Sequence, residues 1–176
     1  MSSVERDGVH RPCTVLFLCT GNSARSILAE ALLNHWGGER FRGLSAGSHP
    51  KGAVHPLALA LLAERGLPSG GLRSKSWDEF AQPGAAPIDV VLTVCDAAAG
   101  ETCPYWPGQP VTAHWGIPDP AAVDGPEDRR RQAFSDAFDT LEQRIRLLTG
   151  LPIETLSASA LQHRLRAIAG TSVAKR

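Results

Sequence analysis

The sequence lacks the features that point to a membrane or a nucleic acid. No apolar stretch reaches the roughly 18 residues that a membrane-spanning helix needs. Lysine plus arginine equals aspartate plus glutamate, at 18 each, so no excess charge favours nucleic acid or an acidic membrane surface. We therefore expect neither a membrane nor a nucleic acid as a partner.

The N-terminal residues also lack the apolar core of a signal peptide. Residues 1–12 are mostly polar, and we expect a flexible tail there that does not direct export. This predicts a cytoplasmic protein, and cysteines in the cytoplasm are kept reduced. The four cysteines are therefore expected to serve core packing, metal binding or redox chemistry, and not a structural disulfide framework.

The composition is that of a single globular domain. Of the 176 residues, 43% are hydrophobic and 20% are charged, and a chain of this length favours one core. Strands are predicted at residues 14–18, 41–46, 88–94 and 110–113, and helices at 27–36, 55–65 and 127–148. Alternation of this kind favours an α/β fold, with a parallel sheet covered on both faces.

We expect this domain to occupy residues 13–150 and a C-terminal extension to follow at 151–176. Apolar residues of the extension have the spacing of one helix face, namely Leu156, Leu161, Leu165 and Ile168. The extension is predicted to be an amphipathic helix, packed on the outside of the domain, followed by a loose end.

The segment between the first predicted strand and the first predicted helix has the residues of an oxyanion-binding loop. It reads Cys-Thr-Gly-Asn-Ser-Ala-Arg-Ser, from Cys19 to Ser26. Amides at a helix N-terminus are unpaired and carry partial positive charge, so a glycine-containing loop there can wrap them around a tetrahedral anion. Arg25 adds a planar donor fork that suits two oxygens of that anion. The expected anion-binding residues are Thr20, Gly21, Asn22, Ser23, Ala24 and Arg25.

Cys19 is the candidate nucleophile of this loop. The positive field of the loop favours its thiolate form, and Ser26 can donate a hydrogen bond to the thiolate. Asn22 can hold the loop in shape, because asparagine tolerates left-handed backbone angles. A cysteine and an arginine six positions apart also occur by chance, with Cys19 as an ordinary buried residue. Their place between a buried strand and a helix makes that interpretation uncommon.

The segment from Cys19 to Ser26 closely resembles the phosphate-binding loop of low-molecular-weight protein tyrosine phosphatases. It resembles still more closely that of the arsenate reductases that share their fold. The resemblance implies a three-layer αβα sandwich with a four-stranded parallel sheet. It covers about residues 13–150 in consistent order, through Ser45-Ala46-Gly47, Val94-Cys95-Asp96, Cys103-Pro104 and the segment from His114 to Pro120.

Asp119, which precedes Pro120, resembles the general acid of this family. Its implied role is to protonate the departing oxygen while Cys19 attacks. Asp-Pro is also a common turn pair, and without the rest of the motif a turn residue would be the simpler interpretation.

Phosphatases and reductases of this fold differ in the electrons that their reactions need. Hydrolysis of a phosphoryl–cysteine intermediate needs only water, whereas reduction of arsenate takes two electrons, which two thiols supply by becoming a disulfide. Cys95 and Cys103 stand at the positions of the reductase relay, a pair that the phosphatases lack. Ala121 and Ala122 follow the acid where the phosphatases have tyrosines that line a slot for an aromatic substrate.

The resemblance thus implies that the protein reduces arsenate to arsenite in arsenic detoxification. Cys19 attacks arsenate, Cys95 attacks the Cys19 sulfur as arsenite leaves, and Cys103 then attacks Cys95. The implied external reductant is thioredoxin, or glutathione with glutaredoxin, and no tightly bound cofactor is expected. The alternative activity is hydrolysis of phosphate monoesters, and some phosphatase activity is expected beside reduction. A non-catalytic anion-binding module would need neither Asp119 nor the relay pair.

The relatives also suggest a weak potassium site near the loop. The residues at the matching positions are Asn22, Glu30, Ser45 and Asp78.

Overall fold

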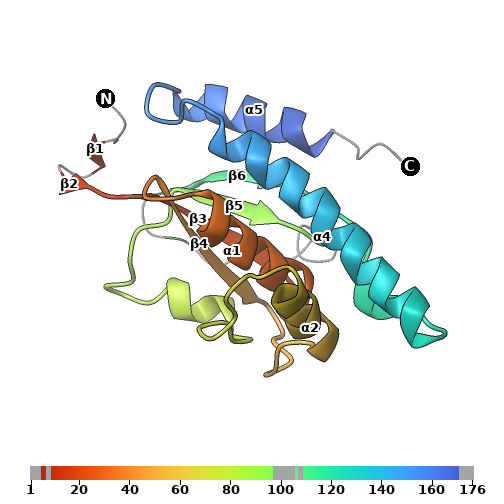
Figure 1. Cartoon of the computed structure of the whole chain (residues 1–176). Coiled ribbons are helices and arrows are strands. Elements are labelled where there is room, and N and C mark those ends of the chain that lie inside the picture. Colours follow the sequence, from red (N-terminus) through yellow and green to blue (C-terminus); the bar gives the residue numbers. More distant parts are fainter. Residues whose placement is uncertain (1–4, 7–8, 97–105, 107–108, 171–176) are drawn as a thin grey trace.

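A four-stranded parallel sheet forms the centre of the protein. The computed structural model describes residues 5–6, 9–96, 106 and 109–170. The strands are β3 (Cys13–Cys19), β4 (Phe41–Gly47), β5 (Val90–Thr93) and β6 (Val111–His114), in the spatial order β4-β3-β5-β6 (Figure 1). Every residue of β3 is buried, as expected of a central strand covered on both faces.

The register of the sheet brings the ends of its strands to one edge. Cys19 pairs with Gly47 at the end of β3 and β4, and Thr93 pairs with His114 at the end of β5 and β6. Because all four strands are parallel, the loops that follow them meet at this carboxyl edge, where such folds bind ligands.

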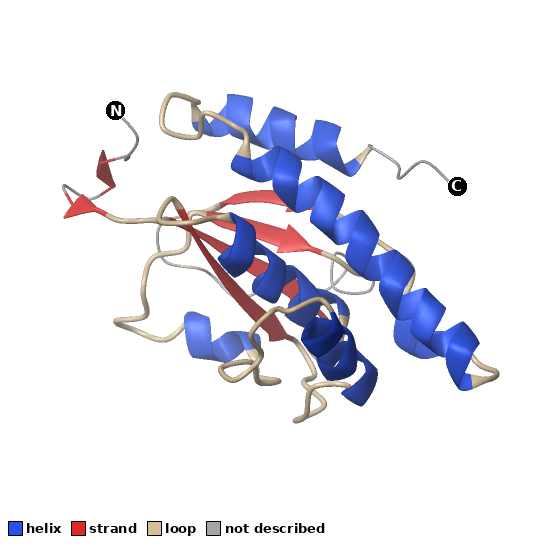
Figure 2. Ribbon diagram, in the orientation of Figure 1, coloured by secondary structure: helices blue, strands red, loops and turns tan. Residues whose placement is uncertain are grey.

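Helices cover one face of the sheet (Figures 1 and 2). They are α1 (Arg25–Trp36), α2 (Pro56–Glu64), α4 (Glu127–Thr149) and α5 (Ala158–Ala169). The predicted apolar stripe of α4 is confirmed, since Phe134, Phe138, Leu141, Ile145 and Leu148 are all buried. Alternate residues of β3, such as Val15 and Phe17, face this helical layer in the main core.

The opposite face of the sheet has a smaller apolar layer. Leu16 and Leu18 point to this side and pack with Val91 and Trp106. Trp77 joins them from a short 3-10 helix, η1 (Trp77–Phe80), which the sequence did not predict. The expected three layers are therefore present, with η1 as the described helix on the second face.

The N-terminal segment contains secondary structure that the sequence did not predict. The expected flexible tail contains a small antiparallel hairpin, in which β1 (Glu5–Arg6) pairs with β2 (Val9–His10). Residues 5–6 and 9–10 of the segment predicted as a tail are thus paired with each other. After the hairpin the chain is anchored where Arg11 donates two hydrogen bonds, of 2.8 and 3.0 Å, to the Asp89 carboxylate.

The predicted amphipathic helix of the C-terminal extension is present as α5. Its apolar face, with Leu161, Leu165 and Ile168, is part of the main core. The carbonyl of Leu165 also accepts a 2.9 Å hydrogen bond from the indole of the fully buried Trp115. The extension thus completes the helical layer next to β6.

None of the described helices has the length and apolar character needed to span a membrane.

Candidate active site

The loop between β3 and α1 turns its carbonyl groups outward. The carbonyl oxygens of Thr20, Gly21 and Ser23 each accept a 2.9 Å hydrogen bond, from the amides of His49, Lys51 and His55 respectively. In a trans peptide the N–H points opposite to the C=O, so the amide that follows each of these carbonyls faces the inside of the loop. This arrangement leaves a ring of amide donors for an oxyanion.

Two residues make this tight loop geometrically feasible. Asn22 has a φ of 45°, the left-handed conformation that the sequence suggested for it. Gly47, at the end of β4, lies so close that a Cβ atom there would overlap the carbonyl oxygen of Thr20. The Ser45-Ala46-Gly47 motif therefore has a physical basis, because no other residue lets β4 approach the loop this closely.

The N-terminus of α1 is open to an anion. Ala24 is its N-cap and offers no side-chain acceptor, and no acidic residue lies in the first turn. The amides of this turn and the positive end of the helix dipole are therefore not neutralised from within the helix.

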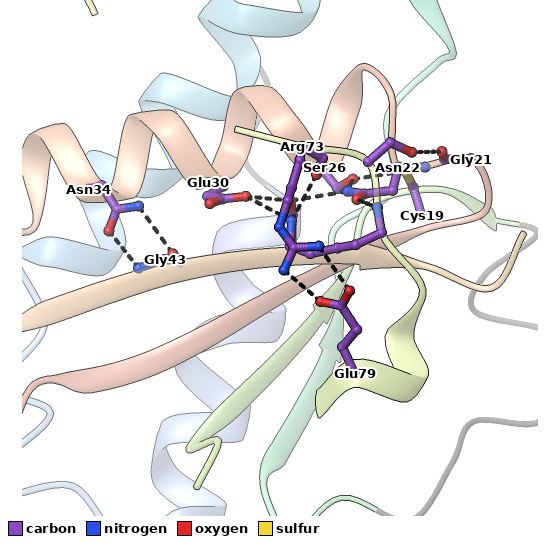
Figure 3. Close-up of polar contacts among 12 residues, drawn as sticks. Cys19, Gly21, Asn22, Ser26, Glu30, Asn34, Gly43, Arg73 and Glu79 are labelled. Carbon is purple, nitrogen blue, oxygen red and sulfur yellow. Dashed lines mark hydrogen bonds and ion pairs between the residues drawn. The ribbon is translucent and has the colours of Figure 1, made fainter. Parts of the chain in front are cut away.

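Hydrogen bonds converge on the sulfur of Cys19 from two sides. The amide of Asn22 lies 3.2 Å from the sulfur, and the hydroxyl of Ser26 lies 2.9 Å from it. The Asn22 side-chain NH₂ donates to the Ser26 oxygen at 2.8 Å, which leaves the serine hydrogen for the sulfur (Figure 3). Both contacts fix the position of the sulfur at the base of the loop.

A cavity of about 170 Å³ lies over the sulfur. Its lining is basic at Arg25 and Lys51, and Asp119 is the acidic side chain among the described lining residues. None of the described lining residues is Phe, Tyr or Trp, and Ala121 occupies the wall next to the acid. A larger cavity of about 230 Å³ lies between α2 and α4, but no described cysteine lines it.

Arg25 and Asp119 face each other across the cavity. The Arg25 guanidinium donates to the carbonyl of Ile117 at 3.0 Å and lies 3.6 Å from the Asp119 carboxylate. The other carboxylate oxygen of Asp119 accepts from the amide of Ala121 at 3.0 Å, so Asp119 also caps the 3-10 helix η2 (Pro120–Ala122). The turn interpretation and the active-site interpretation of Asp119 are therefore compatible.

A buried arginine that is not among the predicted site residues holds the segment before the acid in place. Arg144 of α4 donates to the carbonyls of Trp115, at 2.9 Å, and of Gly116, at 3.3 Å. Burial lowers the pKa of Arg144. A signal was present in the sequence, because position 144 lies on the apolar stripe of its helix between Leu141 and Ile145.

Cys95 lies beside the loop, as predicted from its place after β5. Its sulfur is 3.6 Å from the hydroxyl of Thr20, the residue that follows Cys19. The side chain is buried. Cys103, the third cysteine of the predicted relay, lies outside the described residues.

The structure brings together three of the four residues predicted to bind potassium. The Asn22 side chain donates to Ser45 at 3.0 Å, and Ser45 donates to the Glu30 carboxylate at 2.5 Å. Asp78 instead lies exposed on η1. The charged group that accompanies Glu30 is the ammonium of Lys75, at 3.8 Å.

The fold and this loop define a class of proteins in which a cysteine at the end of the first sheet strand faces an oxyanion pocket. The chain belongs to the low molecular weight phosphotyrosine protein phosphatase family, whose sequence profile matches residues 14–162.

Relatives within this family are arsenate reductases. That of Halalkalibacterium halodurans is 33% identical over 132 residues, which are 75% of this chain and 91% of that protein. That of Bacillus subtilis is likewise 33% identical over 132 residues, with the same coverage of both chains.

Solved structures show the same similarity. The arsenate reductase from Archaeoglobus fulgidus superposes with a TM-score of 0.61 at 30% identity, covering 78% of this chain and 99% of that one. A thioredoxin-dependent arsenate reductase of Corynebacterium glutamicum gives a TM-score of 0.57 at 28% identity, over 78% of this chain and 60% of that one.

Proposed function

We propose that the protein reduces arsenate to arsenite, with Cys19 as the nucleophile and Cys95 and Cys103 as the relay. The observation that carries the proposal is the 3.6 Å contact between Cys95 and Thr20, which brings a second cysteine to the loop of the first. A phosphatase has no use for a second thiol there. The similarity to arsenate reductases supports the same conclusion.

The cavity suits a small inorganic anion. Its volume is about 170 Å³, and among the described lining residues Ala121, and not an aromatic side chain, stands beside the acid. Inward amides and the Arg25 guanidinium supply donors for a tetrahedral oxyanion, and Lys51 adds positive charge at the mouth.

The first chemical step forms a bond between the Cys19 sulfur and arsenic. The thiolate attacks arsenate, and the departing oxygen leaves as water after it takes a proton from Asp119. Arg25 holds the remaining oxygens, and the Asn22 amide and the Ser26 hydroxyl orient the sulfur before the attack.

The reduction itself is the second step. The Cys95 thiolate attacks the Cys19 sulfur, the sulfur–arsenic bond breaks, and its electron pair stays on arsenic, which leaves as arsenite. Cys103 then attacks the Cys95 sulfur and releases the Cys19 thiolate, so the two electrons come from two thiols that end as one disulfide. An external dithiol restores them, in an activity that serves arsenic detoxification in the cytoplasm.

We infer that this reductant is thioredoxin, in preference to glutathione with glutaredoxin. The similarity to the thioredoxin-dependent enzyme of Corynebacterium glutamicum supports this order. The deciding experiment is an arsenate turnover assay that compares thioredoxin and thioredoxin reductase with glutathione and glutaredoxin. Turnover with neither system would contradict the proposal.

Phosphatase activity is proposed as a side reaction, because the same nucleophile, oxyanion loop and acid can also act on a phosphate monoester. We expect Cys19→Ser to abolish both arsenate reduction and aryl phosphate hydrolysis. Cys95→Ser and Cys103→Ser should each stop arsenate turnover while sparing the hydrolysis. Loss of hydrolysis in both relay variants, with melting temperatures unchanged, would instead favour a phosphatase with structural cysteines.

A further inference from the structure

A continuous chain of buried polar groups leads from α1 to the sulfur of Cys19. Ser45 donates to Glu30, and the Asn22 NH₂ group donates both to Ser45 and to Ser26. Ser26 in turn contacts the sulfur. Figure 3 labels Glu30, Asn22, Ser26 and Cys19 of this series. Glu30 and Ser26 lie four residues apart on α1, so they share one face of that helix. All five groups are buried.

The backbone of Lys75 sets the donor–acceptor direction of these hydrogen bonds. Its amide donates at 2.8 Å to the side-chain oxygen of Asn22, and an amide N–H can only donate. The NH₂ end of Asn22 is therefore turned towards Ser45 and Ser26. The carbonyl of Lys75 in turn accepts from the amide of Gly47 at 2.9 Å, which ties the segment to the end of β4.

The side chain of Lys75 supplies the positive charge beside these hydrogen-bonded groups. It is 8% exposed, and its ammonium lies 3.8 Å from the Glu30 carboxylate and donates to the carbonyl of Arg73 at 2.9 Å. A buried carboxylate is costly unless a cation or donors accompany it. Burial raises the pKa of Glu30, and hydrogen bonding by Ser45 and the charge of Lys75 oppose that shift.

The same groups do not fit a potassium ion. The Ser45 hydrogen points to Glu30, and the Asn22 oxygen is occupied by the Lys75 amide, so Asn22 presents an NH₂ group to this site. Asp78 is exposed on η1. A cation here would have to compete with an ammonium that already faces the carboxylate.

We propose that Lys75 is the resident cation of the oxyanion loop, a positioning residue that makes the protein independent of monovalent metal ions. The ammonium keeps Glu30 as a carboxylate, the carboxylate holds the Ser45 hydrogen, and Asn22 and Ser26 are thereby set to stabilise the Cys19 thiolate. The proposal rests on Cys19 as the nucleophile of the proposed function, but not on arsenate as the substrate.

The first test needs only the unmodified protein. Alkylation of Cys19 by iodoacetamide, followed on its peptide by mass spectrometry, and aryl phosphate hydrolysis are measured in potassium, sodium and choline chloride at equal ionic strength. We expect equal rates in the three salts. A rise of severalfold in potassium alone would overturn the proposal.

The second test removes the ammonium. In Lys75→Met, Cys19 alkylation at neutral pH should fall about tenfold, the scale of one hydrogen bond to a charged group. In Lys75→Met/Glu30→Gln the glutamine oxygen still accepts from Ser45 and no charge is buried, so most of the rate should return. The matched control is Arg73→Gln, which removes a positive charge from the same segment but from an exposed side chain paired with Glu79.

The outcomes separate this proposal from the proposed function. Equal alkylation in the unmodified protein and in Lys75→Met, or the same loss in Arg73→Gln, would contradict a positioning role for Lys75. If Lys75→Met does not fold, the variant Lys75→Met/Glu30→Gln decides. If this variant folds but its Cys19 is alkylated ten times more slowly than in the unmodified protein, the positioning role of Lys75 is contradicted. Failure of the unmodified protein to reduce arsenate would refute the proposed function and leave the alkylation test intact.

Discussion

Asp119→Asn should separate catalysis from stability. Asparagine keeps an oxygen that can accept from the Ala121 amide, and it is as good an N-cap as aspartate, so η2 should persist. The contact with Arg25 is 3.6 Å long and the Asp119 side chain is 40% exposed. Exposed ion pairs contribute about 1 kcal/mol or less, so the free energy of unfolding should change by no more than that.

The effect on the rate should be much larger. An amide cannot donate the proton that the departing oxygen needs, and loss of a general acid costs roughly a hundredfold or more. A hundredfold corresponds to about 2.7 kcal/mol in the activation free energy. Oxyanion binding should survive, because Arg25 and the inward amides are unchanged.

Rapid-quench single turnovers with arsenate measure this difference. Asp124→Asn, at an exposed position two residues after η2, is the control. Aryl phosphates with increasingly basic leaving groups provide a second measure, because the penalty should grow with the basicity of the leaving oxygen. If Asp119→Asn is as fast as the unmodified protein, Asp119 serves only as the cap of η2. An equal penalty for every leaving group would likewise refute the acid role.

Two further predictions concern the loop and its surroundings. Gly47→Ala places a Cβ against the carbonyl oxygens of Thr20 and Cys19. In denaturant melts it should lower the free energy of unfolding by about 1–3 kcal/mol, and it should also slow Cys19 alkylation. Gly70→Ala, where a Cβ meets open space, should change neither quantity. Burial, followed by the charges of Arg130 and Lys51, lowers the pKa of His55 from its ordinary 6.5, and its Nδ1 accepts from the amide of Leu57 as the cap of α2. Because the folded state resists protonation of His55, the contribution of this residue to stability is complete above pH 6.5 and is lost as the pH falls below that value. Denaturant melts on both sides of pH 6.5 should therefore show a smaller loss of unfolding free energy on acidification for His55→Asn than for the unmodified protein. An equal loss in the two proteins would contradict this.

The conformation of the loop from Cys19 to Ser26 could be predicted from the sequence because it depends on neighbouring residues. A buried strand, a short polar turn with glycine and a helix suffice to place Cys19, Asn22, Arg25 and Ser26 around one anion. The strand ends then bring Cys95 and the acid loop to the same edge, since parallel strands share their direction.

The parts that the sequence did not predict depend on contacts between distant segments. Lys75 is buried beside Glu30 because its backbone pairs with Gly47 and Asn22, and composition alone does not choose it over Asp78 three residues later. Arg144 reaches the acid loop only once α4 packs against it. The N-terminal hairpin consists of two-residue strands, which are too short for any periodic signal.

The most direct test of the account is a single turnover without external reductant. The reduced protein, freed of small thiols and kept under argon, is mixed with arsenate, and arsenite is counted while disulfides are mapped by mass spectrometry. We expect one arsenite per chain, after which the reaction stops with a Cys95–Cys103 disulfide and Cys19 again a thiol. Absence of arsenite from a protein that hydrolyses aryl phosphates, or arsenite formed without that disulfide, would contradict it.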